Sequence, residues 1–387
     1  MPVALIDAVQ TAFPKCDFVL ERYVCSPLPP MPNLISLTAT VHCHCDPLVH
    51  FQPILRHSPR LRHMDIQAYV HSGCVMQVVI MDDDQHDKPF LTGNWDEPIC
   101  GPSGPFLESL VLQDERWSEQ GAAKCTADMS WSRLRTLELR RCDAAHLLRA
   151  CVPVASTMPE LAAFKYTTWD NTPDVRANTA HVLRDFLATA NGLQELHLEG
   201  PYASLLKVIA ENHGKTLQSL ILHDHERPSK PQRVPMSTTD LIELGERCLS
   251  LQHLGIDVDE HYALPVGKNP SENHRWSLLK GKLNRGTQPH SLATILNHNQ
   301  YFPALRKVTL FALLGIAREA KRYGRGQTLF ALDMLQLRVP YIMLPDIGDE
   351  SSTAPAKLHT IVVQIGEENR SVGVGYPAGK PVIPLFL

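Results

Sequence analysis

The chain has 387 residues, of which 44% are apolar, 20% charged and 6% aromatic, with 37 basic and 41 acidic side chains. This apolar fraction excludes a disordered chain, and a formal net charge of −4 gives no general drive toward nucleic acid. No apolar run approaches the length of about 18 residues that a membrane span needs, and the N-terminal segment lacks the basic start of a secretory signal.

The cysteines predict the redox state of the chain. There are ten of them, and they lack the dense, patterned spacing of a small disulfide-stabilised scaffold. We therefore expect reduced thiols and a cytoplasmic or nuclear location.

A leucine-based repeat organises most of the chain. Residues 1–33 are predicted to form an N-terminal capping helix or repeat, with a helix over residues 3–13. After them the pattern apolar-x-x-apolar-x-apolar recurs, and four of the ten intervals between its first leucines are 27 residues. These first leucines are Leu34, Leu61, Leu107, Leu134, Leu161, Leu193, Leu217, Leu251, Leu305, Leu332 and Leu358.

Each pattern predicts a short strand, because its second and third apolar residues alternate with polar ones. Such a strand buries too little surface alone, so neighbouring copies must stack and share one core. Helical spacing precedes several strands, over residues 178–190 and 203–213 and after Ser237, a predicted N-cap. Prolines stand just before other strands, where a helix must end: Pro32, Pro59, Pro159 and Pro303.

The fold class that follows is α/β, as a solenoid of irregular repeats of about 27 residues. Its parallel sheet is expected to curve along the concave side, with helices on the convex side. An ordinary α/β fold with parallel strands is the alternative. We predict a solenoid over residues 34–366, a C-terminal tail over 367–387, and four insertions: 68–106, 226–237, 259–290 and 344–357.

The insertions leave two questions open. The long intervals of 46 and 54 residues indicate either inserted segments or eroded repeats, and Val75, Val78 and Ile80 are candidates for an extra strand. The inserted segments are either partner-binding loops on one rim or tolerated excursions.

The triplets, such as Leu134-Leu137-Leu139, resemble the LxxLxL segment of the leucine-rich-repeat family, from Leu34 to Gln364. That family places Asn or Cys eight residues after the first leucine, where Cys142 matches and Pro201 and Asp259 do not, so irregular turns are expected. The chain is similar in particular to the repeat region of fungal F-box/leucine-rich-repeat proteins, although no F-box is found before Leu34. This resemblance implies a non-enzymatic role in protein recognition related to ubiquitin ligation.

Several polar motifs do not reach the pattern that a ligand or reaction needs. Residues 42–46 (HCHCD) lack a second ligand pair for zinc, and residues 82–87 lack the Gly and distant Glu of a calcium loop. Residues 223–226 (HDHE) have no converging nucleophile and are interpreted as surface residues on a turn. Ser103 and residues 373–381 miss the spacings of a nucleophile elbow and a phosphate loop.

We therefore predict no catalytic residue, no metal and no cofactor. The alternative is an enzyme or metal-binding protein whose site is built from the insertions. A basic segment over residues 312–325 is interpreted as a solvated helix face, with weak RNA binding as its alternative.

The candidate binding surface follows from the predicted sheet. Residues two, four and six positions after each first leucine face away from the core. The charged and histidine residues selected from these positions are Glu138, Arg140, Lys165, Glu195, His197, Glu199, His223, His253 and Asp257. We expect a protein partner with basic or amide-rich chemistry, and weaker binding below about pH 6.5, where histidine gains a proton. The alternative is that these residues have no binding role, because any solvent-exposed strand face carries polar side chains.

Overall fold

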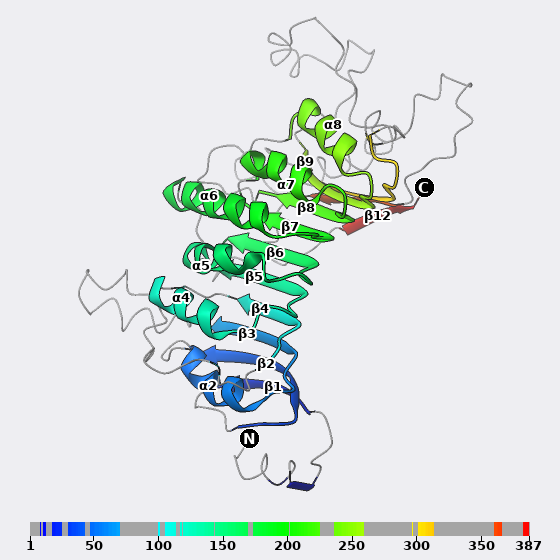
Figure 1. Cartoon of the computed structure of the whole chain (residues 1–387). Helices are drawn as coiled ribbons and strands as arrows, with labels where there is room; N and C mark the ends of the chain where they lie inside the picture. Colours follow the sequence, from blue (N-terminus) through cyan, green and yellow to red (C-terminus); the bar gives the residue numbers. More distant parts are fainter. Residues whose placement is uncertain are drawn as a thin grey trace, which may run out of the picture. The chain divides into compact units, whose positions relative to one another are not determined.

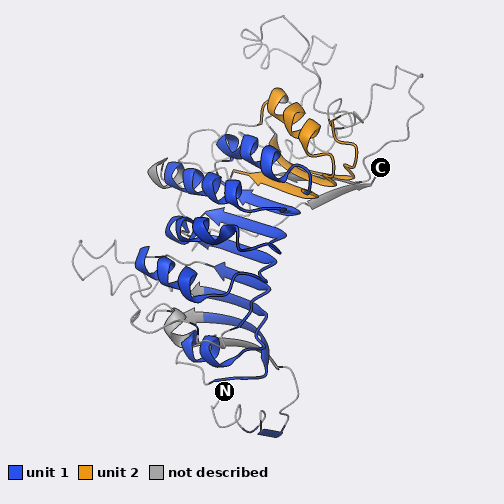
Figure 2. Cartoon of the chain, viewed as in Figure 1, with its two compact units in different colours: residues 1–216 blue, residues 217–387 orange. Residues whose placement is uncertain are grey.

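The computed structural model describes the chain in parts, which form two compact units, Met1–Thr216 and Leu217–Leu387 (Figure 2). The described residues are 8, 11–12, 18–24, 30–42, 47–69, 100, 105–113, 117, 119–142, 144–168, 173–200, 202–224, 236–258, 296, 301–312, 360–365 and 382–386.

Unit 1 contains a parallel sheet in which each described strand pairs with the next one in chain order (Figure 1). Its strands are β1 (Phe18–Val24), β2 (Leu34–His42), β3 (His63–Tyr69), β4 (Ser109–Gln113), β5 (Thr136–Cys142), β6 (Ala163–Thr168) and β7 (Glu195–Glu199). Strand β1 lies in the segment predicted as the capping repeat.

The helices of unit 1 cover one face of this sheet (Figure 1). They are α2 (Pro47–His57), α4 (Glu119–Asp128), α5 (Ala145–Ala155), α6 (Pro173–Thr189) and α7 (Leu206–His213), with the 3-10 turn η2 (Ala203–Leu205) before α7. Successive helices pack side by side, α4 on α5, α5 on α6 and α6 on α7. The opposite face, which we call the sheet face, carries no described helix of this unit.

Burial along the strands explains this layering. In β6, Phe164 and Tyr166 are buried, whereas Ala163 and Lys165 are only partly so. Leu196 and Leu198 repeat this alternation in β7. Fully burying one such side chain contributes roughly 1.5–3 kcal/mol to the stability of the fold. The buried apolar residues therefore pack the strands against the helices, and the alternate positions of each strand point to the sheet face.

A recurring turn precedes several of the strands. The N–H of Leu161 donates to the carbonyl of Met158, three residues earlier, and Pro159 occupies the turn between them. The same bond joins Leu34 to Met31, and the carbonyl of Arg135 accepts the N–H groups of both Ala162 and Ala163. The prolines before the strands are thus turn residues, and Pro59 and Pro159 follow the ends of α2 and α5, consistent with the predicted helix ends.

Several local predictions are confirmed. The thiol of Cys142 is buried and donates to the carbonyls of Leu112, 3.2 Å away in the preceding strand, and Arg140, which links adjacent strands at the one position where the family pattern matched. The predicted helix over residues 178–190 corresponds to α6, which begins earlier, at Pro173. It stops before Gly192, whose φ of +71° is readily adopted only by glycine.

Unit 2 contains the parallel strands β8 (Ser219–His223), β9 (His253–Val258), β10 (Lys307–Ala312) and β11 (Thr360–Ile365), and β12 (Val382–Phe386), which is antiparallel to β11. Its described helix of several turns is α8 (Thr238–Arg247), where Ser237 is the N-cap, as predicted, in a capping box with Asp240. Strand β12 lies within the segment predicted as a tail.

Strand pairing is direct across the three longest gaps between described strands: β3 pairs with β4, β9 with β10, and β10 with β11. The leucine segment predicted to begin at Leu332 lies outside the described residues. Most of the four predicted insertions, including residues 75–80, and the predicted helix over 3–13 lie outside the described residues, apart from isolated positions.

The α/β class is confirmed, with parallel strands alternating with helices, and ten of the predicted leucine segments are strands, while the eleventh, at Leu332, lies outside the described residues. This arrangement is compatible with a leucine-rich-repeat-like solenoid. None of the described helices combines the length and the apolar character required to cross a membrane.

Candidate functional site

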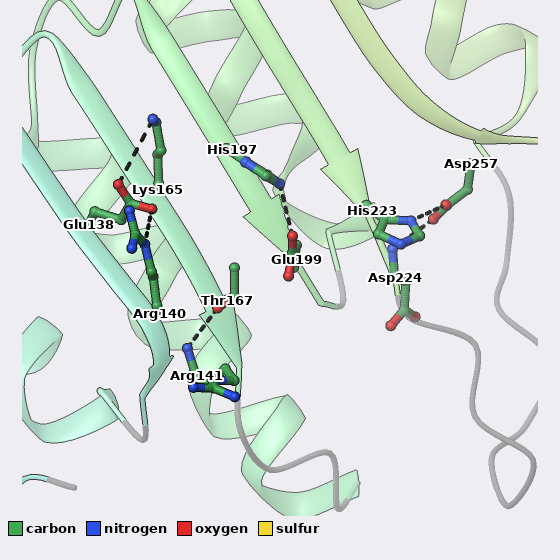
Figure 3. A network of polar contacts seen from close by, with 10 residues as sticks. All are labelled: Glu138, Arg140, Arg141, Lys165, Thr167, His197, Glu199, His223, Asp224 and Asp257. Atoms are coloured by element: carbon green, nitrogen blue, oxygen red, sulfur yellow. Dashed lines mark hydrogen bonds and ion pairs between the residues drawn. The ribbon is translucent and has the colours of Figure 1, made fainter. Parts of the chain in front are cut away.

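The sheet face of unit 1 carries charged side chains over neighbouring strands (Figure 3). Glu138 lies at the centre of β5, with its side chain 15% exposed. Its carboxylate accepts a hydrogen bond from Nε of Arg140 and lies 3.9 Å from Nζ of Lys165 on β6. One carboxylate is therefore shared by two cations, one from its own strand and one from the adjacent strand.

Asp65, on β3, belongs to the same face and was missed from the sequence. Burial raises the pKa of Asp65, Arg140 opposes this effect, and Glu138 adds to it. The hydrogen bond to Glu138 raises the pKa of Arg140 in turn. Asp65 stands four residues after Leu61, so the rule that selected Glu138 would have found it.

Strand β7 continues this surface with Glu195, His197 and Glu199, as predicted. Nε2 of His197 lies 3.2 Å from Oε1 of Glu199, and both side chains are partly exposed. Glu195 is exposed and pairs in the strand register with the small residue Ala163 on β6. We call the six residues of these three strands the β5–β7 surface: Glu138, Arg140, Lys165, Glu195, His197 and Glu199.

A bulge closes the end of strand β5. Arg141 has a positive φ of 51°, and the strand register shifts between Leu139 and Cys142. The backbone N–H of Arg141 donates to Oγ1 of Thr167 at 2.7 Å, which replaces the interrupted ladder (Figure 3). The bulge therefore fixes where the β5–β7 surface ends, and no sequence signal indicated it.

The corresponding residues of unit 2 differ from the prediction. His223 on β8 and Asp257 on β9 were expected on an exposed surface, but they are 4% and 2% exposed. Nδ1 of His223 lies 2.7 Å from Oδ1 of Asp257, and Oδ2 of Asp257 accepts the N–H of Asp224 at 2.8 Å (Figure 3). The earlier interpretation of His223 as a surface turn residue is therefore wrong.

Aromatic packing contributes to this burial. The ring of Phe311 on β10 stacks on His223 with centroids 4.1 Å apart. Between β8 and β10 stands Gly255, where an added Cβ would lie 3.1 Å from Ile221 and 3.3 Å from Phe311. Because Gly255 has no side chain, Ile221 and Phe311 can pack closely over β9 at this position.

His253, the remaining predicted site residue, bridges two hydroxyls. Its Nδ1 lies 3.3 Å from Oγ of Ser219, and its Nε2 lies 3.0 Å from Oγ1 of Thr309. A serine beside a histidine is one element of nucleophilic catalysis. Asp257, however, binds His223 on β8, so the acid that would orient a catalytic histidine is held by a different imidazole.

The described cysteines are buried thiols that form no disulfide bond: Cys100, Cys125, Cys142, Cys151 and Cys248. Burial raises the pKa of Cys100, Cys151 and Cys248 to about 12 and that of Cys125 well above its ordinary value. These four thiols are therefore protonated at neutral pH and are poor nucleophiles and metal ligands.

Most other motifs cannot be placed. Residues 43–46, 82–87 and 225–226, Ser103, the basic segment after Ala312, and residues 373–381 lie outside the described residues. Within the described part of the chain, no group of three or more His, Cys, Asp or Glu residues could hold a metal ion.

No protein-family model matches the chain, and the search of curated proteins finds no match either. The function therefore has to be inferred from the geometry of the β5–β7 surface itself.

Proposed function

We propose that this protein is a non-enzymatic protein-binding module and that the β5–β7 surface of unit 1 contacts the partner. The observation that carries the proposal is the set of partly exposed charged side chains on three adjacent strands. They stand at alternate positions, above a core of buried leucine and aromatic residues.

Preorganisation supports this role. Glu138 fixes Arg140 and Lys165 by ion pairing, and the strand ladder fixes the backbone beneath them. Side chains that are already ordered lose less conformational entropy when a partner binds. A partner can therefore recognise this surface without ordering it first.

The resemblance to the repeat region of F-box proteins suggests the biological setting of the proposal. In that setting the β5–β7 surface would present a bound protein for ubiquitin ligation. Affinity purification from cells tests this part, because recovery of a ubiquitin-ligase adaptor subunit with the full chain supports it, and its consistent absence argues against it.

Site-specific photo-crosslinking tests the binding surface directly. We would place p-benzoylphenylalanine at Ala163, which lies beside Glu195 in the strand register, and at Arg184, an exposed residue of helix α6, as the matched control. The proposal predicts crosslinked protein adducts from position 163 and few from position 184. Equal yields at both positions, or no adduct at position 163, would refute it.

A further inference from the structure

We propose that the β5–β7 surface binds an extended, basic segment of its partner, with an arginine or lysine side chain placed against Glu195. This inference rests on the proposed function and adds the chemical class of the partner. It is carried by an asymmetry of charge across the three strands and by the space beside Glu195.

The carboxylate of Glu195 differs from the other acidic groups of this surface. Glu138 already binds Arg140 and Lys165, and Glu199 lies beside His197. Glu195 is exposed, and within the described residues it has no ion pair or hydrogen bond from its side chain. It is therefore the carboxylate that a cation of a partner can approach with the smallest cost of desolvation.

Charge is divided unevenly between the strands. The outward positions of β7 carry two carboxylates, Glu195 and Glu199, and one histidine. Those of β5 and β6 carry Glu138 with two cations, Arg140 and Lys165. The negative potential of this surface therefore centres on β7, and electrostatic complementarity favours a partner that brings cations to that strand.

The residues beside Glu195 leave room for such a side chain. In the strand register, Ala163 on β6 lies beside Glu195, and Thr136 on β5 lies beside Ala163. Both are small, and both are partly exposed. A long arginine or lysine stem can lie across these strands and place its charged end at the Glu195 carboxylate.

The spacing of the acids favours an extended segment. Glu195 and Glu199 are four residues apart on one strand, so their Cα atoms are separated by about 13 Å, given a rise of about 3.3 Å per residue. An extended peptide places its residues i and i+4 at the same separation. One segment with two basic residues at that spacing can therefore address both carboxylates.

Fluorescence anisotropy with two defined peptides tests the inference. One labelled 13-residue peptide alternates arginine with serine, and the second alternates glutamate with serine. We expect the full-length protein to bind the basic peptide and to bind the acidic one at least about ten-fold more weakly, because the charges are reversed. Added salt should weaken the binding, because exposed ion pairs are screened.

Charge reversal locates the site. Glu195→Lys should weaken binding of the basic peptide about ten-fold, whereas Glu246→Lys, which makes the same change of charge at an exposed position of helix α8, should leave it unchanged. Circular dichroism checks that both variants are folded. No binding of the basic peptide, equal binding of both peptides, or equal effects of the two substitutions would each overturn the inference.

The crosslinking experiment separates this inference from the proposed function. If position 163 forms adducts that persist in the Glu195→Lys background, the surface binds protein, but the basic-segment inference is wrong. If position 163 forms none, the proposed function itself fails.

Discussion

The sheet face of unit 1 and the corresponding strands of unit 2 are built from similar residues, yet they differ in burial. In unit 1, Glu138 and Lys165 form an ion pair that solvent reaches. In unit 2, His223 and Asp257 form a shorter contact with almost no exposure. Alternating polar residues therefore indicate which side of a strand a residue occupies, but they do not indicate whether that side is open.

The origin of the difference lies in the neighbours of β9. Gly255 and Asp257 are buried, as Leu254 and Ile256 are, so β9 is covered on both faces from Leu254 to Asp257. Strand β7, in contrast, alternates buried residues with exposed or partly exposed ones. A charged group in such a position needs fixed hydrogen bonds, because burial without them is costly. Asp257 has them from His223 and from the backbone N–H of Asp224.

The largest expected effect concerns that buried pair. Asp257→Ala leaves the imidazole of His223 and the N–H of Asp224 without their acceptor, and we expect it to lower the free energy of unfolding by about 3 kcal/mol. Denaturant unfolding followed by circular dichroism measures this change.

Glu138→Ala is the matched control in unit 1. It removes a carboxylate that also holds two partners, but solvent can replace it there, so we expect a loss below about 1 kcal/mol. Equal losses for the two variants would contradict the difference between the two regions.

A smaller loss of stability is expected when a side chain is added at Gly255 on β9. In Gly255→Ala, the new methyl group meets Ile221 and Phe311 at 3.1–3.3 Å, and overpacking of this kind costs roughly 1–3 kcal/mol. The same added volume on the open face, as in Ala163→Val on β6, should change stability by less than about 0.5 kcal/mol. Thermal unfolding of both variants measures this difference in stability. An unchanged stability of Gly255→Ala would indicate that Ile221 and Phe311 do not pack tightly around Gly255.

The smallest effect concerns acid sensitivity on the helix side of unit 1. Burial lowers the pKa of His213, whose Nε2 lies 2.9 Å from the carbonyl of Leu187, while its buried Nδ1 has no partner among the described residues. The unfolded chain therefore binds this proton more readily than the folded one. The contribution of His213 to the free energy of unfolding is therefore fully present above its pKa in the unfolded chain, near 6.5. It is lost as the pH falls from there toward the lower pKa of His213 in the folded protein.

The measurement is the unfolding midpoint between pH 7.5 and pH 5. In the variant His213→Gln the amide can still donate to Leu187, but the titrating group is gone. We expect the midpoint of this variant to fall less on acidification than that of the unaltered protein. Parallel curves would show that His213 does not contribute.

The leucine periodicity predicted most strand positions because each triplet records which residues face the core. Ser237 was predictable as an N-cap because its bonds to Asp240 lie within one turn, whereas the contact of Cys142 with Leu112 joins residues 30 positions apart in the sequence. Strand β1 was not predicted as a strand, since its sequence lacks the leucine triplet. The segment at Leu332 also has the triplet, but it lies outside the described residues.

The candidate surface was predictable only in part. The alternation rule placed Glu138, Lys165 and the residues of β7 correctly on the face opposite the helices. It failed for the exposure of His223 and Asp257. The ring of Phe311, from a strand distant in the sequence, packs on His223, and His223 in turn contacts Asp257. A rule that considers one strand at a time contains no information about such cross-strand packing.

Carbodiimide labelling of carboxylates, with mass spectrometry to locate the modified residues, tests the central claim most directly. The account predicts that Glu195 in the folded full-length protein is modified rapidly and is protected by the basic peptide, while Asp257 reacts only after the protein unfolds. Modification of Asp257 as fast as that of Glu195 in the folded protein would contradict it.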